Sequence, residues 1–194
     1  MTIDERDRLG DKLRNAGSAV ISQWAAKSDR ELLAKLQRQT EKRLQNDRNA
    51  KRQARAFNTI LCATDFGLWS LKALDLAKQI AVENQASLYI VHVCPTVTVP
   101  LGGTTPVVPE AEAVASKRLQ EIAAEHLVAI PHDLIVITGD PADRIMELQS
   151  ILQADLIVVG TQGRGGVPRF FLGSVADRVV RAAECPVLTI RGKS

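Results

Sequence analysis

The sequence predicts an α/β protein with a five-stranded, parallel, doubly wound sheet, preceded by an α-helical extension. From residue 58 onward, short apolar segments rich in β-branched residues alternate with longer segments whose apolar residues recur at helical spacing. Residues 1–55 instead consist largely of helix-forming residues. We therefore expect a helical extension over 1–55 and an α/β domain over 56–194.

The extension is expected to form a helical pair or one long helix. Ser28 and Glu31 have the spacing of a capping box, which predicts a helix that begins at Ser28. From Glu31 to about Arg55 the residues are strong helix formers, and one stripe of this helix is largely apolar. The stripe contains Leu32, Leu33, Leu36, Thr40 and Leu44. It is expected either to contact a second copy of the chain or to fold back on its own chain.

The basic charge of the chain lies in this extension. The net charge is +3, and residues 30–55 hold nine basic and three acidic side chains. A basic helix suits nucleic-acid binding, a solvated face or the docking of a protein partner. The interspersed Glu31, Glu41 and Asp47, and the lack of aromatic residues, disfavour nucleic acid and favour the other two. We expect an unknown protein partner for the extension.

The α/β part should contain five strands and four helices. The expected strands cover 58–64, 86–93, 132–138, 155–160 and 186–191. The expected helices cover 69–84, 110–129, 141–153 and 174–184, and Asp140 is the expected N-cap of the third. Residues 95–109 contain four prolines and Gly102–Gly103, and we expect them to form an irregular, mobile flap.

The expected strand order is 3-2-1-4-5, which makes strands one and four neighbours. In open parallel sheets, ligands bind at the carboxyl ends of the strands where the chain reverses its winding direction. Asp65 follows strand one and Gly160 ends strand four. Two motifs far apart in sequence are therefore expected to meet at one crevice.

The segment after strand four is typical of a phosphate-binding loop. Gly160 permits a sharp turn off the strand, and Gly163 permits close approach of a ligand. Gly173 and Ser174 are expected to present free amides at the start of a helix, which favours an anion. Arg164 and Arg169 are suited to pair with phosphate. The loop is neither a Walker A motif nor a dinucleotide fingerprint.

The spacing of Gly160, Gly163 and Gly173–Ser174 resembles the nucleotide-binding signature of the universal stress protein family, in its ATP-binding branch. The resemblance covers residues 57–191. The Thr64–Gly67 turn, the Val93 position and the Gly139–Pro141 turn also match the family pattern, whereas Ala63 stands where many members have proline. The resemblance implies ATP as the ligand, with Mg²⁺ held by its phosphates and no metal ligands from the protein. The implied nucleotide-binding residues are Ala63, Thr64, Asp65, Val93, Gly139, Val159, Gly160, Gln162, Gly163, Arg164, Gly173, Ser174 and Val175.

The expected function is a stress-response protein that uses ATP as a regulatory ligand, with little or no hydrolysis. The loop offers no general base, although Asp65 or Gln162 could orient a water for weak ATPase activity. His92 is expected to be a hydrogen-bonded strand-end histidine. An alternative is an enzyme of the adenine-nucleotide α-hydrolase kind, but such enzymes carry Ser-Gly-Gly-x-Asp-Ser after strand one, where this chain has Thr-Asp-Phe-Gly.

The remaining expectations concern location and assembly. No apolar run reaches about 18 residues and no apolar leader is present, so we expect a cytoplasmic protein without a membrane span. Cys62, Cys94 and Cys185 are expected to be free, buried or half-buried thiols. The terminal strand, Pro186–Arg191, is expected to pair with its own copy, and dimers of this kind are common in the family, so we expect a homodimer.

Overall fold

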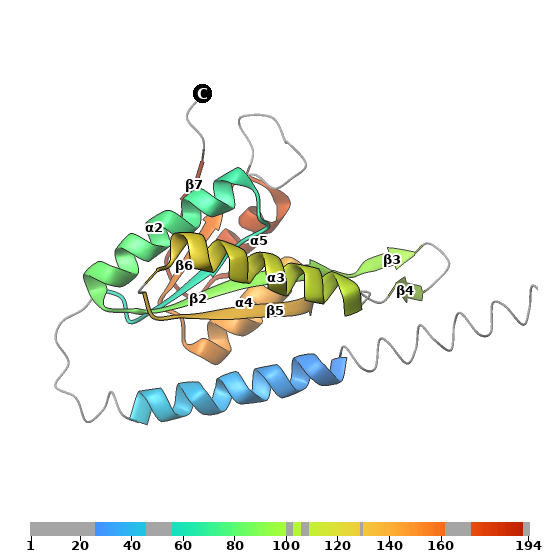
Figure 1. Ribbon diagram of the computed structural model, residues 1–194, viewed down its shortest axis with the longest axis horizontal. Coiled ribbons are helices and arrows are strands. Elements are labelled where there is room, and N and C mark those ends of the chain that lie inside the picture. Colours follow the sequence, from blue (N-terminus) through green and yellow to red (C-terminus); the bar gives the residue numbers. More distant parts are fainter. Residues whose placement is uncertain are drawn as a thin grey trace, which may run out of the picture.

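The structure is a computed structural model that describes residues 26–45, 56–99, 103–105, 109–128, 130–161 and 172–191. Five strands form a parallel sheet in the order β5-β2-β1-β6-β7 (Figure 1). Counted along the chain within this sheet, that is the predicted order 3-2-1-4-5. The predicted fold class is therefore confirmed.

The elements of the sheet and its layers begin at or next to the residues expected from the sequence. The strands are β1 (Thr59–Ala63), β2 (Ser87–Pro95), β5 (His132–Gly139), β6 (Leu156–Gly160) and β7 (Val187–Ile190). The helices are α2 (Leu68–Asn84), α3 (Pro109–His126), α4 (Pro141–Leu152) and α5 (Ser174–Ala182). No helix in the described ranges is long and apolar enough to cross a membrane.

Two apolar layers explain the continuous apolar runs of the central strands. Ile60 and Cys62 of β1 pack with α2 and α3 on one face of the sheet. Leu61, between them, packs with α4 and α5 on the other face. Because successive side chains of a strand point to opposite faces, a strand covered on both faces must be apolar throughout.

The segment between β2 and α3 is more regular than expected. Two short strands, β3 (Val97–Val99) and β4 (Gly103–Thr105), form an antiparallel ladder, and α3 begins at Pro109. The prediction of an irregular segment over 95–109 was therefore wrong. Valine and threonine favour extended backbone, which suits both short strands.

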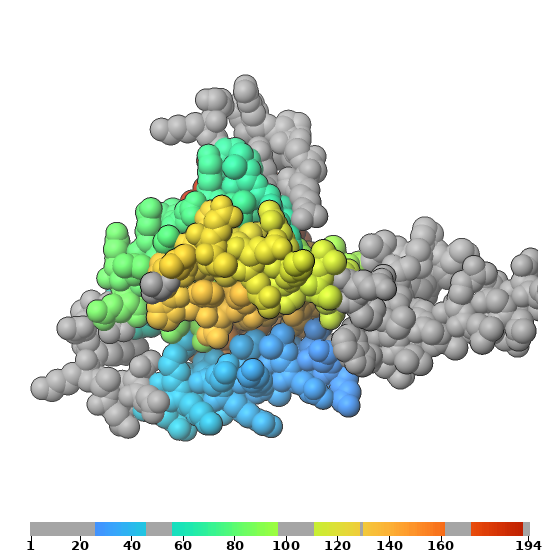
Figure 2. Space-filling view, viewed as in Figure 1, coloured from blue at the N-terminus to red at the C-terminus, as the bar shows by residue number. Residues whose placement is uncertain are grey.

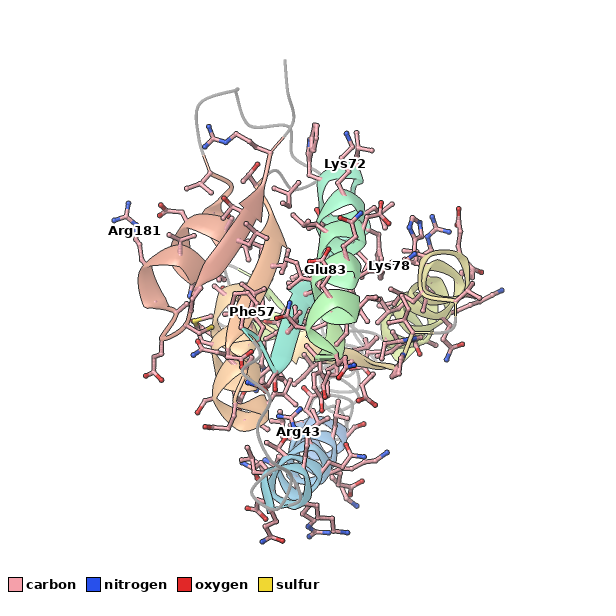
Figure 3. All side chains as sticks on the ribbon, turned by 90° about the vertical axis from the view of Figure 1, so that its left-hand side faces the viewer. Arg43, Phe57, Lys72, Lys78, Glu83 and Arg181 are labelled. Atoms are coloured by element: carbon pink, nitrogen blue, oxygen red, sulfur yellow. The ribbon has the colours of Figure 1, made fainter. Side chains whose placement is uncertain are left out.

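A further helix, α1 (26–45), lies along the edge strand β5 and outside the sheet (Figures 1 and 3). In the space-filling view it forms a separate blue layer below α3 and α4 (Figure 2). The predicted start at Ser28 was wrong, because residues 26 and 27 are already helical and Ser28 is exposed within the helix. A capping serine needs non-helical backbone. The rest of 1–55 lies outside the described residues.

The apolar stripe of α1 folds back on its own chain. Leu36 is 5% exposed and belongs to the same core cluster as Tyr89 and Val91 of β2. Leu32 and Leu33 pack partly buried against this cluster, whereas Leu44 is 40% exposed. Of the two uses expected for the leucine stripe, intramolecular packing is therefore the one observed.

Candidate functional site

A cleft of about 140 Å³ opens at the carboxyl ends of β1 and β6. These two strands are neighbours, with Ala63 paired in register with Val159. The lining residues come from three strands, from the turn after β1 and from the N-terminal parts of three helices. They are Ala63, Thr64, Asp65, Ser70, Val91, His92, Val93, Pro141, Ile145, Val159, Gly160, Val175 and Ala176. The cleft lies at the crevice predicted from the strand order.

The structure brings together a large part of the residue set expected from the sequence. The expected residues that line the cleft are Ala63, Thr64, Asp65, Val93, Val159, Gly160 and Val175. Gly173 and Ser174 immediately precede Val175 at the start of α5, and Gly139 does not line the cleft. Gln162, Gly163, Arg164 and Arg169 lie outside the described residues.

The turn after β1 is held by a compact hydrogen-bond network. The Asp65 Oδ1 accepts from the Gly67 amide at 3.0 Å, and the Thr64 Oγ1 accepts from the Phe66 amide at 3.0 Å. The Ser70 hydroxyl donates to the Gly67 carbonyl at 2.9 Å, which makes Thr64 the donor in the 3.0 Å contact between the two hydroxyls. These bonds fix Asp65 at the cleft, where its carboxylate organises the turn.

His92, in the second half of β2, joins this strand to the turn. Its Nδ1 lies 2.8 Å from the Thr64 carbonyl oxygen, so Nδ1 carries the proton and donates. Its ring stacks on Phe66 with centroids 4.1 Å apart and 22° between the planes. The prediction of a hydrogen-bonded His92 is confirmed, although β2 continues three residues beyond it, and the residue also lines the cleft.

Gly160 is required by the close approach of α2 to the end of β6. A Cβ added at Gly160 would lie 2.8 Å from the Ser70 nitrogen and 2.8 Å from the Trp69 carbonyl carbon. Both atoms belong to the backbone in the first turn of α2, which cannot move aside as a flexible side chain can. The glycine therefore allows α2 to bring Ser70 to the cleft.

The start of α5 differs from expectation in one bond. The Gly173 amide donates to the Thr161 carbonyl oxygen at 2.7 Å, so the prediction of a free amide at Gly173 was wrong. This bond ties the start of α5 to the end of β6. The amides of Ser174, Val175 and Ala176 follow in the first turn, where a helix provides no internal acceptor, and Gly173 has no side chain to cap them. They are the donors that α5 offers to an anion.

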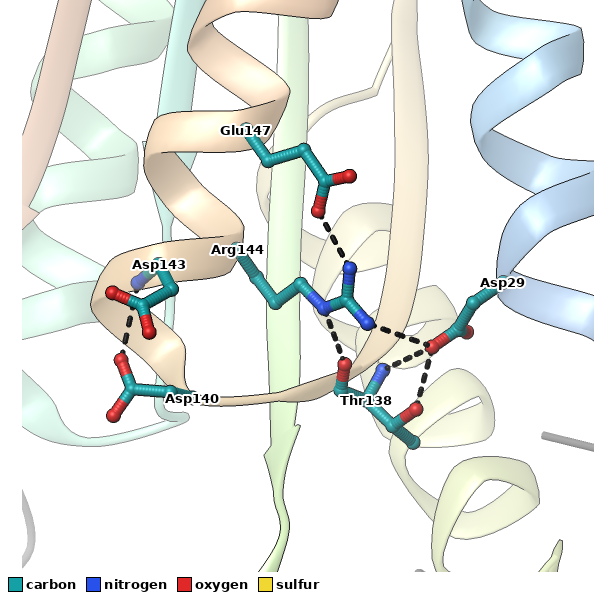
Figure 4. A network of polar contacts seen from close by, with 6 residues as sticks. All are labelled: Asp29, Thr138, Asp140, Asp143, Arg144 and Glu147. Carbon is teal, nitrogen blue, oxygen red and sulfur yellow. Dashed lines mark hydrogen bonds and ion pairs between the residues drawn. The ribbon is translucent and has the colours of Figure 1, made fainter. Parts of the chain in front are cut away.

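The turn after β5 borders the cleft through Pro141 and Ile145 of α4. Asp140 caps α4, as predicted, by accepting from the Asp143 amide at 3.1 Å (Figure 4). That amide bond, with a further contribution from Arg178, lowers the pKa of the Asp140 carboxyl. Gly139 has a φ of +138°, and an added Cβ would lie 2.7 Å from the Arg144 Nε. The conformation of this turn therefore explains the glycine at position 139.

Sequence reasoning missed several lining residues. Ser70, Pro141, Ile145 and Ala176 line the cleft from the N-terminal parts of α2, α4 and α5. The signal was available, because in a parallel α/β sheet the helices begin at the edge where the strands end. Their N-termini also contribute a partial positive charge at the cleft. Asp65 supplies the one carboxylate of the lining, and no metal-binding cluster occurs among the described residues.

Comparison with known proteins places residues 56–191 within the model of the universal stress protein family. A universal stress protein of Methanocaldococcus jannaschii is 37% identical over 142 residues, covering 70% of this chain and 82% of the relative. A universal stress protein from Thermus aquaticus is 38% identical over 138 residues, covering 70% of this chain and 99% of the relative. The fold matches universal stress protein UspA from Lactobacillus plantarum with a TM-score of 0.57 and 26% identity, over 72% of this chain and 100% of that one. A universal stress protein crystallised in complex with cAMP matches with a TM-score of 0.54 and 29% identity, over 71% of this chain and 99% of that one.

Proposed function

Because the chain belongs to the universal stress protein family, we propose that it binds ATP as a regulatory ligand in the stress response, with little or no hydrolysis. The observation that carries this proposal is the cleft at the ends of β1 and β6, where apolar walls, one carboxylate and the start of α5 meet. The structural neighbour crystallised with cAMP supports an adenine nucleotide as the ligand class.

The base and the sugar are assigned to the inner part of the cleft. Ala63, Val93 and Val159 give this part an apolar lining, which suits the faces of an adenine ring. Asp65 stands at the end of β1 with a carboxylate, a group that commonly accepts hydrogen bonds from ribose hydroxyls at such crevices. In this arrangement the ribose lies between Asp65 and the start of α5.

The phosphates are assigned to the start of α5 and to the loop that precedes it. The first-turn amides of Ser174, Val175 and Ala176 provide donors at the positive end of a helix. Gly163 and Arg164 are proposed to complete this site from the loop. Asp65 is the one carboxylate among the described lining residues, so Mg²⁺ would be held mainly by the phosphates.

The polar groups around the cleft favour binding of the nucleotide without hydrolysis. The Nδ1 of His92 donates to Thr64, the Asp65 carboxylate accepts from Gly67, and the Ser70 hydroxyl donates to the Gly67 carbonyl. These bonds use the side chains to build the turn. A general base must instead be placed to accept a proton from an attacking water. We therefore propose slow or absent hydrolysis.

The test is to identify by mass spectrometry the nucleotide that co-purifies with the protein. Wild-type protein is expected to retain ATP, and the double variant Gly163→Val and Gly173→Val is expected to lose it. Calorimetric titration of Ala63→Leu, which narrows the cleft, should give an ATP affinity about tenfold or more weaker. The matched control is Val82→Leu, because Val82 is 57% exposed on α2 and does not line the cleft. Retention of ATP by the double variant would show that the site is misassigned.

We also propose that two copies pair through β7. It is the edge strand opposite β5, and its four residues are only partly buried. An open edge presents unpaired backbone groups to an identical strand. Sedimentation at micromolar concentration should therefore give a dimer, and a monomer would contradict this proposal. The cytoplasm remains the predicted location.

A further inference from the structure

The second edge of the sheet, β5, is in contact with α1. The Thr138 backbone points away from β2 here, because its amide donates to the Asp29 Oδ2 at 3.3 Å and its carbonyl accepts from the Arg144 Nε at 2.7 Å. Backbone groups alternate in direction along a strand, so those of Leu134 and Val136 also point outward. At Thr138, helix α1 therefore occupies the side of β5 on which a further strand would pair.

Helix α1 runs antiparallel to β5 and matches its length. Asp29 meets β5 at Thr138, near the end of the strand. Arg43 donates to the Tyr89 hydroxyl at 3.3 Å and to the Leu152 carbonyl at 2.9 Å, and Tyr89 is in register with Asp133 near the start of β5. Residues 29 and 43 are roughly 21 Å apart along a helix, and Asp133 and Thr138 are roughly 17 Å apart along a strand.

The covered strand has the composition of an edge that needs protection. Residues 134–138 read Leu-Ile-Val-Ile-Thr, without a charge or a proline. Uncharged, β-branched segments at an open edge pair readily with an identical segment, and proteins commonly cover such edges with a helix. At this edge the cover comes from outside the region that matches the family model, which begins at residue 56.

The buried residues of α1 lie on one face of the helix. Asp29, Leu36 and Thr40 are its buried residues, and Arg43 is half-buried. The Thr40 hydroxyl is buried without a hydrogen-bond partner among the described residues, which weakens docking. The opposite face carries the exposed Lys27, Lys35, Arg38 and Lys42. The helix is therefore held by one buried stripe, and its opposite face is exposed to solvent.

We infer that α1 is a removable cover of the β5 edge, and that the uncovered edge pairs with the β5 edge of a second copy. Two identical strands related by a two-fold axis pair in antiparallel orientation. This contact is separate from β7 and from the nucleotide cleft. If β7 also pairs, a chain with both edges open assembles beyond the dimer.

The test compares full-length Leu36→Asp with its matched control, Leu44→Asp. The first places a charge in the buried contact of α1, and the second changes a leucine of the same helix that is 40% exposed. In Leu36→Asp, tryptic cleavage at Arg38 and Lys42 should accelerate about tenfold or more, because docking no longer protects the helix. The mass from sedimentation should reach about twice the wild-type mass or more and rise with concentration. Leu44→Asp should match wild type in both measurements.

Hydrogen exchange then locates the contact. In Leu36→Asp, the amides of β5 should exchange faster than in wild type at low protein concentration and regain protection at high concentration. If Leu36→Asp does not fold, Asp29→Asn, with Glu31→Gln as control, is measured in the same way. An unchanged rate of tryptic cleavage, an unchanged mass after α1 is released, or a larger assembly without protection of β5 would each overturn the inference.

Discussion

The Asp29 carboxylate accepts a hydrogen bond of 2.6 Å from the Thr138 hydroxyl, although 109 positions separate the two residues. Asp29 is 5% exposed and also lies 3.8 Å from the Arg144 guanidinium, which in turn bonds Glu147 (Figure 4). One carboxylate thus joins α1 to β5 and to the first turns of α4. The extension is fastened to the α/β part by a buried polar contact as well as by leucines.

Replacing Asp29 by alanine should destabilise the protein by about 1–3 kcal/mol, because a buried hydroxyl and a buried amide lose their acceptor. Urea unfolding followed by circular dichroism measures this loss. Glu31→Ala is the control, because Glu31 is exposed on the same helix and its pair with Lys27 spans 3.9 Å. Equal losses in the two variants would contradict the importance of the Asp29 contact.

Replacing Glu112 by glutamine should stabilise the protein at neutral pH. Burial, and to a smaller extent the charge of Asp29, raise the pKa of the Glu112 carboxyl, and its Oε1 is buried without a hydrogen-bond partner among the described residues. A carboxyl whose pKa is raised in the folded state stabilises the fold only at low pH. This contribution to stability is lost as the pH rises through the pKa of the folded state. The gain from Glu112→Gln should therefore be present at pH 7 and vanish near pH 4, as thermal unfolding at both values would report.

The matched control for this pH effect is Glu125→Gln on the same helix, because Glu125 is exposed. Its melting temperature should change little at either pH. A lower melting temperature for Glu112→Gln at pH 7 would mean that the ionised carboxylate is favoured in the folded state. That outcome would contradict the direction assigned to its pKa.

The sheet and the position of the cleft could be predicted because their signals are local. Short apolar runs marked each strand, and the alternation of strands with helices restricted the topology to few choices. Asp65 and Gly160 were identified because both follow buried strands, and strand order alone brings strand ends together. These predictions needed no knowledge of individual side-chain contacts.

The contacts that fasten α1 could not be predicted in the same way. Asp29 with Thr138, and Arg43 with Tyr89, are pairs of distant residues on elements whose periodicity is the same with or without the contact. The bond from Gly173 to Thr161 likewise depends on how the ends of one loop meet. Helical spacing indicates that a face is buried, but it does not indicate what covers it.

The three thiols should react with Ellman's reagent at very different rates. Burial raises the pKa of Cys62 to about 12 and that of Cys94 to about 11, and both side chains are buried. The thiolate is the nucleophile, and at pH 8 only about one in ten thousand Cys62 side chains is ionised, because its pKa is about 12. Cys185 is half-buried and should react first. Cys185→Ser should remove the fast phase, and a fast phase that persists would contradict this order.

Replacing Gly160 by alanine should both destabilise the fold and weaken nucleotide binding. The added Cβ would lie 2.8 Å from backbone atoms of Trp69 and Ser70, so α2 or β6 must shift, at a cost of about 1–3 kcal/mol. The same shift moves Ser70 and the floor of the cleft, and ATP titration should show the loss of affinity. Val82→Ala is the control for stability, because Val82 is 57% exposed on α2 and does not line the cleft. Wild-type stability in Gly160→Ala would mean that α2 does not press on the end of β6.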